Sequence, residues 1–235
     1  MLYTEVTRPS DISSSSREDM FQIMDCYYQN MKREKFESDL KEKTHVVFLK
    51  NRENTIVGFT TLLLWDINVE GVAIKGLYSG DTIVEKMYWG QTQLQSALGR
   101  LMIQVCREHS DTPVYWLLSS KGYKTYCMLP LYFLHFYPTY NEKTPCFEKK
   151  VIDMYGALKF GDAYNPITGI AVNNGEKDLL REGVAEPAEN KLSNEHVRFF
   201  LQKNFGYRNG DELVCVARIA QNNVRSVVRR FEQHG

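Results

Sequence analysis

The sequence has no net charge, no long apolar run and no closely paired cysteines. Its 29 lysines and arginines balance 29 aspartates and glutamates, so no overall field attracts nucleic acid or an anionic membrane. No apolar stretch approaches the roughly 20 residues that a membrane-spanning helix needs, and the first residues lack the pattern of a signal peptide. The five cysteines are scattered without a CxxC pair, which predicts reduced thiols in a cytoplasmic protein.

Zinc-ligand spacings, a phosphate-binding P-loop, internal repeats and low-complexity tracts are also missing. We therefore expect no metal site. What the sequence does contain is apolar material, with 43% hydrophobic and 12% aromatic residues, which is enough for a sizeable core. A length of 235 residues predicts one large domain or a domain with an appendage.

Residues 77–121 carry the pattern around which the fold is expected to form. A β-rich run at 77–87 leads through a short turn at 88–90 into a helix, and a second β-rich run follows at 114–119. An apolar stripe with helical spacing predicts the helix: Leu94, Ala97, Leu98, Leu101, Met102, Val105 and Cys106. A helix that begins directly after a strand points free backbone N–H groups at its start, where an anion such as a phosphate binds.

Regular patterns also occupy most of the remaining chain. After an extended lead-in over the first ten residues, the predicted elements are helices at 15–31 and 34–43 and strands at 45–49, 55–65 and 72–78. Past an aromatic stretch interrupted by Pro130, a helix at 147–158, a strand at 167–172, a helix at 194–204, a strand at 212–218 and a helix at 222–231 are predicted. We expect a first domain at 1–138 and a C-terminal α+β extension, packed on it, at 139–235.

This order of elements resembles the GNAT acyltransferase superfamily over about residues 14–138. The segment Ile56 to Phe59 is similar to its second strand. The stretches YYQNMKREKFESDLKEK, SKGYKTY and NGDELVCVA are similar to a bacterial GNAT-like group with a C-terminal extension. The resemblance implies an α/β fold with a mixed central sheet flanked by helices.

The resemblance also implies a donor site between the first β-rich run and the central helix. The superfamily has Arg/Gln-x-x-Gly-x-Gly/Ala there, and this chain has Trp89-Gly90-Gln91-Thr92-Gln93-Leu94. Gly90 fits, whereas Thr92 and Leu94 replace the later glycines, which let backbone amides close on a pyrophosphate. The expected donor is acyl-CoA, or the phosphopantetheine of an acyl carrier protein. The expected donor-binding residues are Met87, Gly90, Gln91, Thr92, Gln93, Leu94 and Lys121.

Lys121 belongs to this set because it follows the 114–119 run, where it could hold a phosphate or a carboxylate. The alternative for Lys121 is a solvated loop.

Two catalytic roles follow from the same resemblance. Asp81 interrupts a β-rich run together with Gly80, and both are poor strand formers, so we expect Asp81 to be the base that deprotonates an amine. The alternative is a turn or bulge with a solvated carboxylate. Tyr132 is expected to protonate the leaving thiolate, in competition with Tyr126 and Tyr123; the alternative for a tyrosine in so aromatic a stretch is core packing.

The sequence thus predicts an N-acyltransferase that moves an acyl group from a thioester to a small-molecule amine, with a carrier protein as a possible partner. Membranes and nucleic acid are not expected partners. Two alternatives remain open. One is a GNAT-like binding module without turnover, indicated by the missing glycines. The other is an acyltransferase that uses aminoacyl-tRNA, indicated by Arg225, Arg229 and Arg230 near the C-terminus.

Overall fold

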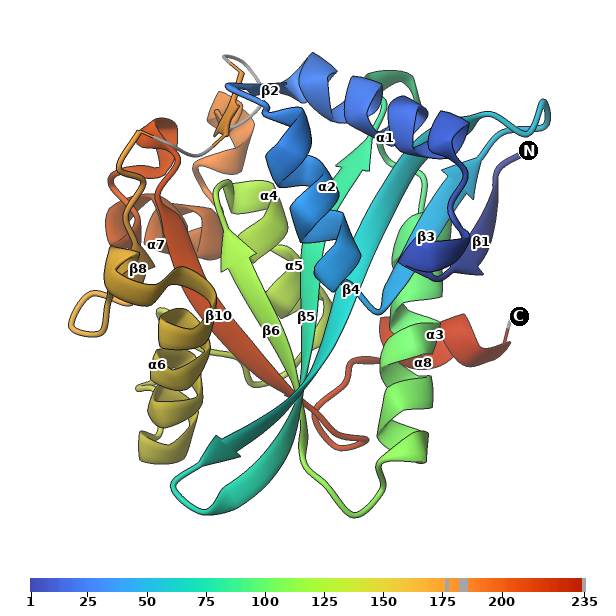
Figure 1. Cartoon of the computed structure of the whole chain (residues 1–235). Coiled ribbons are helices and arrows are strands. Elements are labelled where there is room, and N and C mark those ends of the chain that lie inside the picture. Colours follow the sequence, from blue (N-terminus) through green and yellow to red (C-terminus); the bar gives the residue numbers. More distant parts are fainter. Residues whose placement is uncertain (176–177, 182–185, 234–235) are drawn as a thin grey trace.

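A mixed eight-stranded sheet forms the centre of the protein in this computed structural model (Figure 1). The structure describes residues 1–175, 178–181 and 186–233, the side chains of 229 and 231–233 excepted. The strands are β1 (Tyr3–Thr7), β2 (Tyr28–Gln29), β3 (His45–Lys50), β4 (Ile56–Val69), β5 (Val72–Val84), β6 (Val114–Ser120), β7 (Tyr164–Asn165), β8 (Ile170–Ala171), β9 (Leu179–Leu180) and β10 (Glu212–Ile219). The order across the large sheet is β1-β3-β4-β5-β6-β10-β8-β7, and β2 pairs separately with β9.

Helices cover both faces of this sheet. They are α1 (Ser14–Tyr27), α2 (Arg33–Glu42), α3 (Gln93–Glu108), α4 (Tyr123–Tyr126), α5 (Met128–Tyr132), α6 (Cys146–Phe160), α7 (Glu195–Lys203) and α8 (Ser226–Gln233). One face buries apolar residues of α1, α2 and α6, and the other buries those of α3, α5, α7 and α8. Figure 1 shows α1 and α2 lying across the upper part of β4 and β5. The predicted fold class, a mixed sheet flanked by helices, is confirmed.

Two predicted segments differ in detail from the structure. The lead-in contains a strand, β1, which pairs antiparallel with β3. The separate runs at 72–78 and 77–87 are one strand, β5, which ends at Val84. Gly76 lies inside β5, where a Cβ would come within 2.6 Å of the Leu117 side chain. A glycine is needed at this position because the strands pack closely there, and not because the chain turns.

The neighbouring strands β5 and β6 run parallel but stay paired over a short distance only. Their register extends from Lys75↔Val114 to Tyr78↔Leu117. Beyond these pairs β5 continues along β4, and β6 continues along β10. The buried Trp116 indole donates a hydrogen bond of 2.8 Å to Ser79 Oγ where the strands part. The sheet therefore opens between the carboxyl ends of β5 and β6.

Strands from the C-terminal part of the chain complete the same sheet. β10 pairs antiparallel with β6 from Leu213↔Ser120 to Ile219↔Val114, and β8 and β7 follow beyond it. The β2–β9 pair links the same part of the chain to the connection between α1 and α2. Beside it, the Arg181 guanidinium donates to the Asp25 carbonyl in the last turn of α1 at 2.9 and 3.1 Å. No helix within the described ranges is both long and apolar enough to cross a membrane.

Candidate active site

A cavity of about 610 Å³ occupies the opening between β5 and β6. Its walls are residues 79–84 of β5, the end of β6 with the segment that follows it, and the loop before α3. The connection between α1 and α2 forms a further wall. The C-terminal part of the chain contributes Lys159, Phe160, Asp178, Leu180 and Glu212. The cavity thus reaches from the start of α3 on one face of the sheet to α2 and α6 on the other.

Asp81 lies in a β-bulge at the wall of this cavity. Thr60 pairs with Thr82 and Leu62 with Ser79, so Gly80 and Asp81 together oppose Thr61 alone. The backbone is tightly enclosed there, since a Cβ on Gly80 would lie 2.5 Å from Thr61 Oγ1. The Asp81 side chain lines the cavity. The predicted bulge is therefore present, and Asp81 in it lines the cavity; its role as a base stays a prediction.

The Asp81 carboxylate has the environment of a base. Among the described residues it makes no hydrogen bond or ion pair. Burial and the neighbouring Asp39 carboxylate raise the pKa of Asp81 to about 6, against the opposing effect of the Lys43 ammonium. A carboxylate with this pKa is mostly ionised at pH 7 and accepts a proton more readily than an ordinary aspartate.

Other charged groups at the cavity are paired with one another. The Asp39 carboxylate bonds the Lys43 ammonium at 2.5 Å and the Lys159 ammonium at 3.2 Å. The Lys121 ammonium lies 2.6 Å from the Asp178 carboxylate, and the buried Glu212 carboxylate and Asp178 both raise the pKa of Lys121. The charge of Lys121 is therefore already balanced, which leaves it little capacity to bind the phosphate expected from the sequence.

The start of α3 forms the opposite end of the cavity. Gly90, Gln91 and Gln95 line the cavity there, and the Thr92 side chain does not cap the helix. The Trp89 indole donates to the Val84 carbonyl at 2.8 Å, which fixes the loop onto β5. The Lys124 ammonium lies 4.0 Å from the centre of the Trp89 ring. Uncapped amides and an exposed ammonium together suit an anionic group.

The structure separates the predicted donor-binding residues into two sets. Gly90, Gln91 and Lys121 line the cavity. Met87 is 78% exposed, and its side chain, like those of Thr92 and Gln93, lies outside the cavity lining. The Leu94 side chain is buried in the core beneath α3, because Leu94 belongs to the apolar stripe of that helix. Only its backbone amide faces the helix start.

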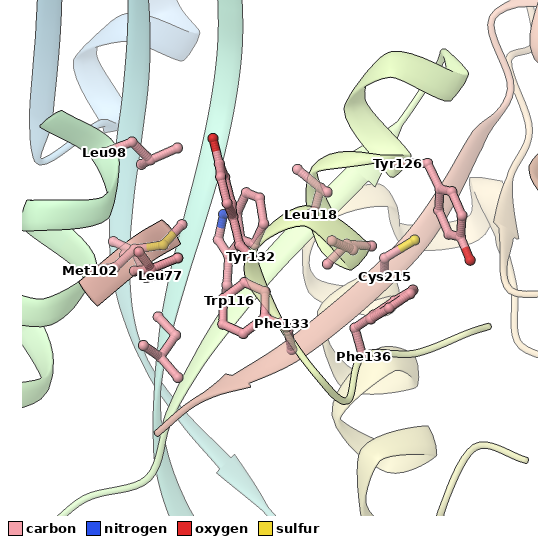
Figure 2. Close-up of a cluster of buried hydrophobic side chains, with 14 of the residues drawn as sticks. Leu77, Leu98, Met102, Trp116, Leu118, Tyr126, Tyr132, Phe133, Phe136 and Cys215 are labelled. Atoms are coloured by element: carbon pink, nitrogen blue, oxygen red, sulfur yellow. The ribbon is translucent and has the colours of Figure 1, made fainter. Parts of the chain in front are cut away.

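Tyr132 is not brought to the cavity. Its side chain is 2% exposed and packs 6.0 Å from the Trp116 ring, centre to centre, within a buried aromatic cluster, as Figure 2 shows. Of its two competitors, Tyr126 is buried and donates to the Pro138 carbonyl at 2.9 Å, whereas Tyr123 lines the cavity. The tyrosine that the structure places at the site is therefore Tyr123, at the first position of α4.

Several site residues were missed by the sequence interpretation. Tyr28 and Tyr78 line the cavity, and burial raises the pKa of both hydroxyls, so they stay protonated at neutral pH. Each is one of fourteen tyrosines and has no neighbouring motif that would single it out. No group of His, Cys, Asp and Glu in the described part of the chain has an arrangement suited to a metal ion.

Two of the three C-terminal arginines singled out in the sequence as possible phosphate contacts have described side chains. The Arg225 guanidinium donates to the Phe133 carbonyl at 3.0 Å, so it ties this segment to the end of α5. Arg230 is exposed, and the Arg229 side chain lies outside the described residues.

A scan against models of known protein families found no match, and neither did a search of curated proteins. Solved structures do resemble the chain. A conserved protein of Enterococcus faecalis described as a probable N-acyltransferase has 14% identity and a TM-score of 0.43, covering 57% of this chain and 33% of its own length. The ElaA protein of Escherichia coli has 17% identity and a TM-score of 0.40, covering 62% of this chain and 95% of its own.

A third structure, the GNAT-family N-acetyltransferase YhbS of Escherichia coli in complex with CoA, has 11% identity and a TM-score of 0.36. The similarity covers 49% of this chain and 63% of YhbS. This chain therefore spans about a third of the length of the Enterococcus protein and nearly two thirds of that of YhbS. All three similarities have TM-scores below 0.5 and cover only part of this chain.

Proposed function

We propose that the protein transfers an acyl group from a thioester donor, acyl-CoA, to the nitrogen of a small-molecule amine. The observation that carries this proposal is the cavity between the parted strands β5 and β6. It has an unpaired carboxylate with a pKa of about 6 at its wall and an uncapped helix start beside a lysine at one end. A base and an anion site connected through one opening are what transfer from a CoA thioester requires.

In this proposal each residue has a separate role. Asp81 accepts a proton from the ammonium form of the acceptor, and the free amine attacks the thioester carbonyl. The C–N bond forms as the C–S bond breaks, and the leaving thiolate takes the proton of the Tyr123 hydroxyl. The nitrogen then loses its surplus proton to the Tyr123 phenolate, which gives the neutral amide and restores the tyrosine. Backbone amides on the edge of β5 that no longer pairs with β6 stabilise the charge on the carbonyl oxygen.

The far end of the cavity favours a small acceptor over a protein. Tyr28 and Leu180, which pair with each other in the β2–β9 ribbon, both line it. Phe160 of α6 and Phe36 of α2 line it as well. Because segments from both parts of the chain enclose this end, a compact amine fits better than an extended peptide.

Binding of the donor is the first expected result. CoA or an acyl-CoA should raise the melting temperature, because a ligand at 100 times its Kd stabilises a protein by about 2.7 kcal/mol. Lys124→Ala should weaken the effect, since it removes the ammonium beside the start of α3. Lys150→Ala serves as the control, because Lys150 is paired with Glu70 and neither residue lines the cavity. No shift with any acyl-CoA at millimolar concentration would contradict a CoA donor.

Two tyrosine variants should behave differently. Tyr123→Phe should slow acyl transfer by about 10-fold or more, the lower range for loss of a general acid, with little change in melting temperature. Tyr132→Phe should leave the rate nearly unchanged, because this side chain is buried in the core and does not line the cavity. Single-turnover rates and thermal melts of both variants are the measurement. A slow, fully stable Tyr132→Phe protein would restore Tyr132 as the acid.

The binding-module alternative predicts that the protein binds the donor without transferring its acyl group. A measurement of the transfer rate therefore distinguishes it from the proposed function, whereas a measurement of donor affinity does not. A carrier-protein donor would show transfer from acyl-phosphopantetheine on a carrier where acyl-CoA is inactive. No contact of the described residues favours aminoacyl-tRNA as donor.

A further inference from the structure

Beside the proposed site lies a buried lysine to which no role has been assigned. Lys43 directly follows α2, and its side chain is 0% exposed. Its ammonium bonds the Asp39 carboxylate at 2.5 Å. The same carboxylate receives Lys159 of α6 at 3.2 Å. A fully buried ammonium is costly unless it has a role or close partners, and here two lysines share one acidic partner.

Lys43 also contacts the bulge that carries Asp81. A Cβ on Gly80 would lie 3.1 Å from Lys43 Cε, so the lysine stem packs against the backbone next to Asp81. The ammonium groups of Lys43 and Lys159 lie 5.6 and 4.9 Å from the centre of the Tyr78 ring. The side of the cavity at α2 and α6 thus holds the ammonium groups of Lys43 and Lys159 and the Asp39 carboxylate between them. The Asp81 carboxylate lies beside this group.

We propose that Lys43, held in place by Asp39, is a positioning residue that keeps the Asp81 carboxylate ionised beside a second carboxylate. Asp81 and Asp39 would repel each other in a partly buried site, and one of them would hold a proton at neutral pH without added positive charge. The two lysines make the group of four neutral when both carboxylates are ionised. This role in catalysis rests on the proposed function, whereas the electrostatic arrangement exists without it.

The remaining groups around Asp81 do not replace Lys43. The Lys121 ammonium lowers the pKa of Asp81 and the Asp178 carboxylate raises it, but these two are paired with each other. Tyr28 and Tyr78 are neutral at pH 7 for the reason given above. Glu212 raises the pKa of Lys121. Lys43 packs against the bulge itself, and its ammonium lowers the pKa of Asp81 more than that of Lys121 does.

The test is a titration of the Asp81 carboxyl by carbon-13 NMR in protein labelled at aspartate, with the signal assigned by its loss in Asp81→Asn. Lys43→Met keeps the length of the side chain and removes its charge, so the titration midpoint should rise by about 1 pH unit or more. Asp39→Asn removes the repelling carboxylate and should lower the midpoint. Lys50→Met is a matched control and should leave the midpoint unchanged. Like Lys43, Lys50 is paired with a carboxylate and lies over an aromatic ring, in its case those of Glu5 and Phe48.

The Asp81 midpoint should rise in Lys43→Met and fall in Asp39→Asn. A purely structural role of Lys43 would not shift the midpoint in opposite directions. An Asp81 midpoint that stays in place in Lys43→Met overturns the proposal. If Lys43→Met does not fold, Asp39→Asn decides, since the Asp39 side chain is 32% exposed; an unchanged or higher midpoint there overturns it as well. The titration needs no substrate, so this proposal and the proposed function can fail separately.

Discussion

Replacing Asp81 by asparagine should lower the single-turnover rate of acyl transfer by about 100-fold or more, the usual scale for loss of a general base. Asparagine has nearly the same size, so the cavity wall keeps its shape while the group that accepts the proton is lost. The assay would use the acyl-CoA that gives the largest thermal shift and a panel of small amines. Asp19→Asn, which changes an exposed carboxylate on α1, is the control and should retain the full rate.

The pH dependence of the rate gives a second measure of the same role. Because the pKa of Asp81 is about 6, the rate should be constant above that value and fall about 10-fold for each pH unit below it. The asparagine variant should lose this dependence. A wild-type rate that continues unchanged down to pH 4 would assign the base to another group.

Stability should move in the opposite sense to activity. The pKa of Asp81 is raised from 3.8 to about 6 in the folded protein, so the contribution of its protonated form is present below pH 3.8 and is lost as the pH rises through 6. Asp81→Asn should therefore melt at a higher temperature than the wild type at pH 8, with a smaller difference at pH 4. Equal differences at both pH values would contradict the raised pKa.

Removing residues 191–235 should give an insoluble or molten product. This deletion takes β10 from between β6 and β8, and it exposes core residues that β10 and α7 cover. Leu213, Val214 and Val216 are each 0% exposed, and burial of such side chains contributes about 1.5–3 kcal/mol each. The loss would exceed the net stability of an ordinary domain. Near-ultraviolet circular dichroism and binding of a hydrophobic dye would report it.

A shorter truncation provides the comparison. Removing 226–235 takes away α8, which packs on α3, and leaves every strand of the large sheet in place. This variant should stay folded with a lower melting temperature. If the protein that ends at residue 190 melts like the wild type, the C-terminal part is an independent appendage. The expectation that the large sheet needs β10 for its stability would then be wrong.

The sequence predicted those parts of the fold that depend on local periodicity. The stripe from Leu94 to Cys106 predicted α3 because helical burial repeats every three to four residues, and the run at 114–119 predicted β6. Pairing between distant strands has no such local signal. That β10 joins β6, and that β9 pairs with β2, depends on contacts between residues about 100 and 150 positions apart, which no local pattern encodes.

The candidate site was predictable where a residue breaks a local rule. Asp81 was singled out because a carboxylate within a β-rich run is unfavourable there, and it lines the cavity. Lys43 and Asp39 break no such rule, since charged residues are common in a helix like α2. Their role follows only from the sheet bulge that lies beside them. Tyr132 was misplaced because aromatic side chains near a site and in a core have the same sequence signature.

The β2–β9 ribbon has a consequence for how selectivity could diverge among relatives of this chain. It consists of two backbone pairs and lies outside the large sheet, yet it brings Tyr28 and Leu180 to the cavity wall, at the end proposed for the acceptor. A substitution at Leu180 would reshape that end without disturbing β5, β6 or the start of α3. Under the proposed function, preference for an acceptor can thus drift under selection while donor recognition stays constant.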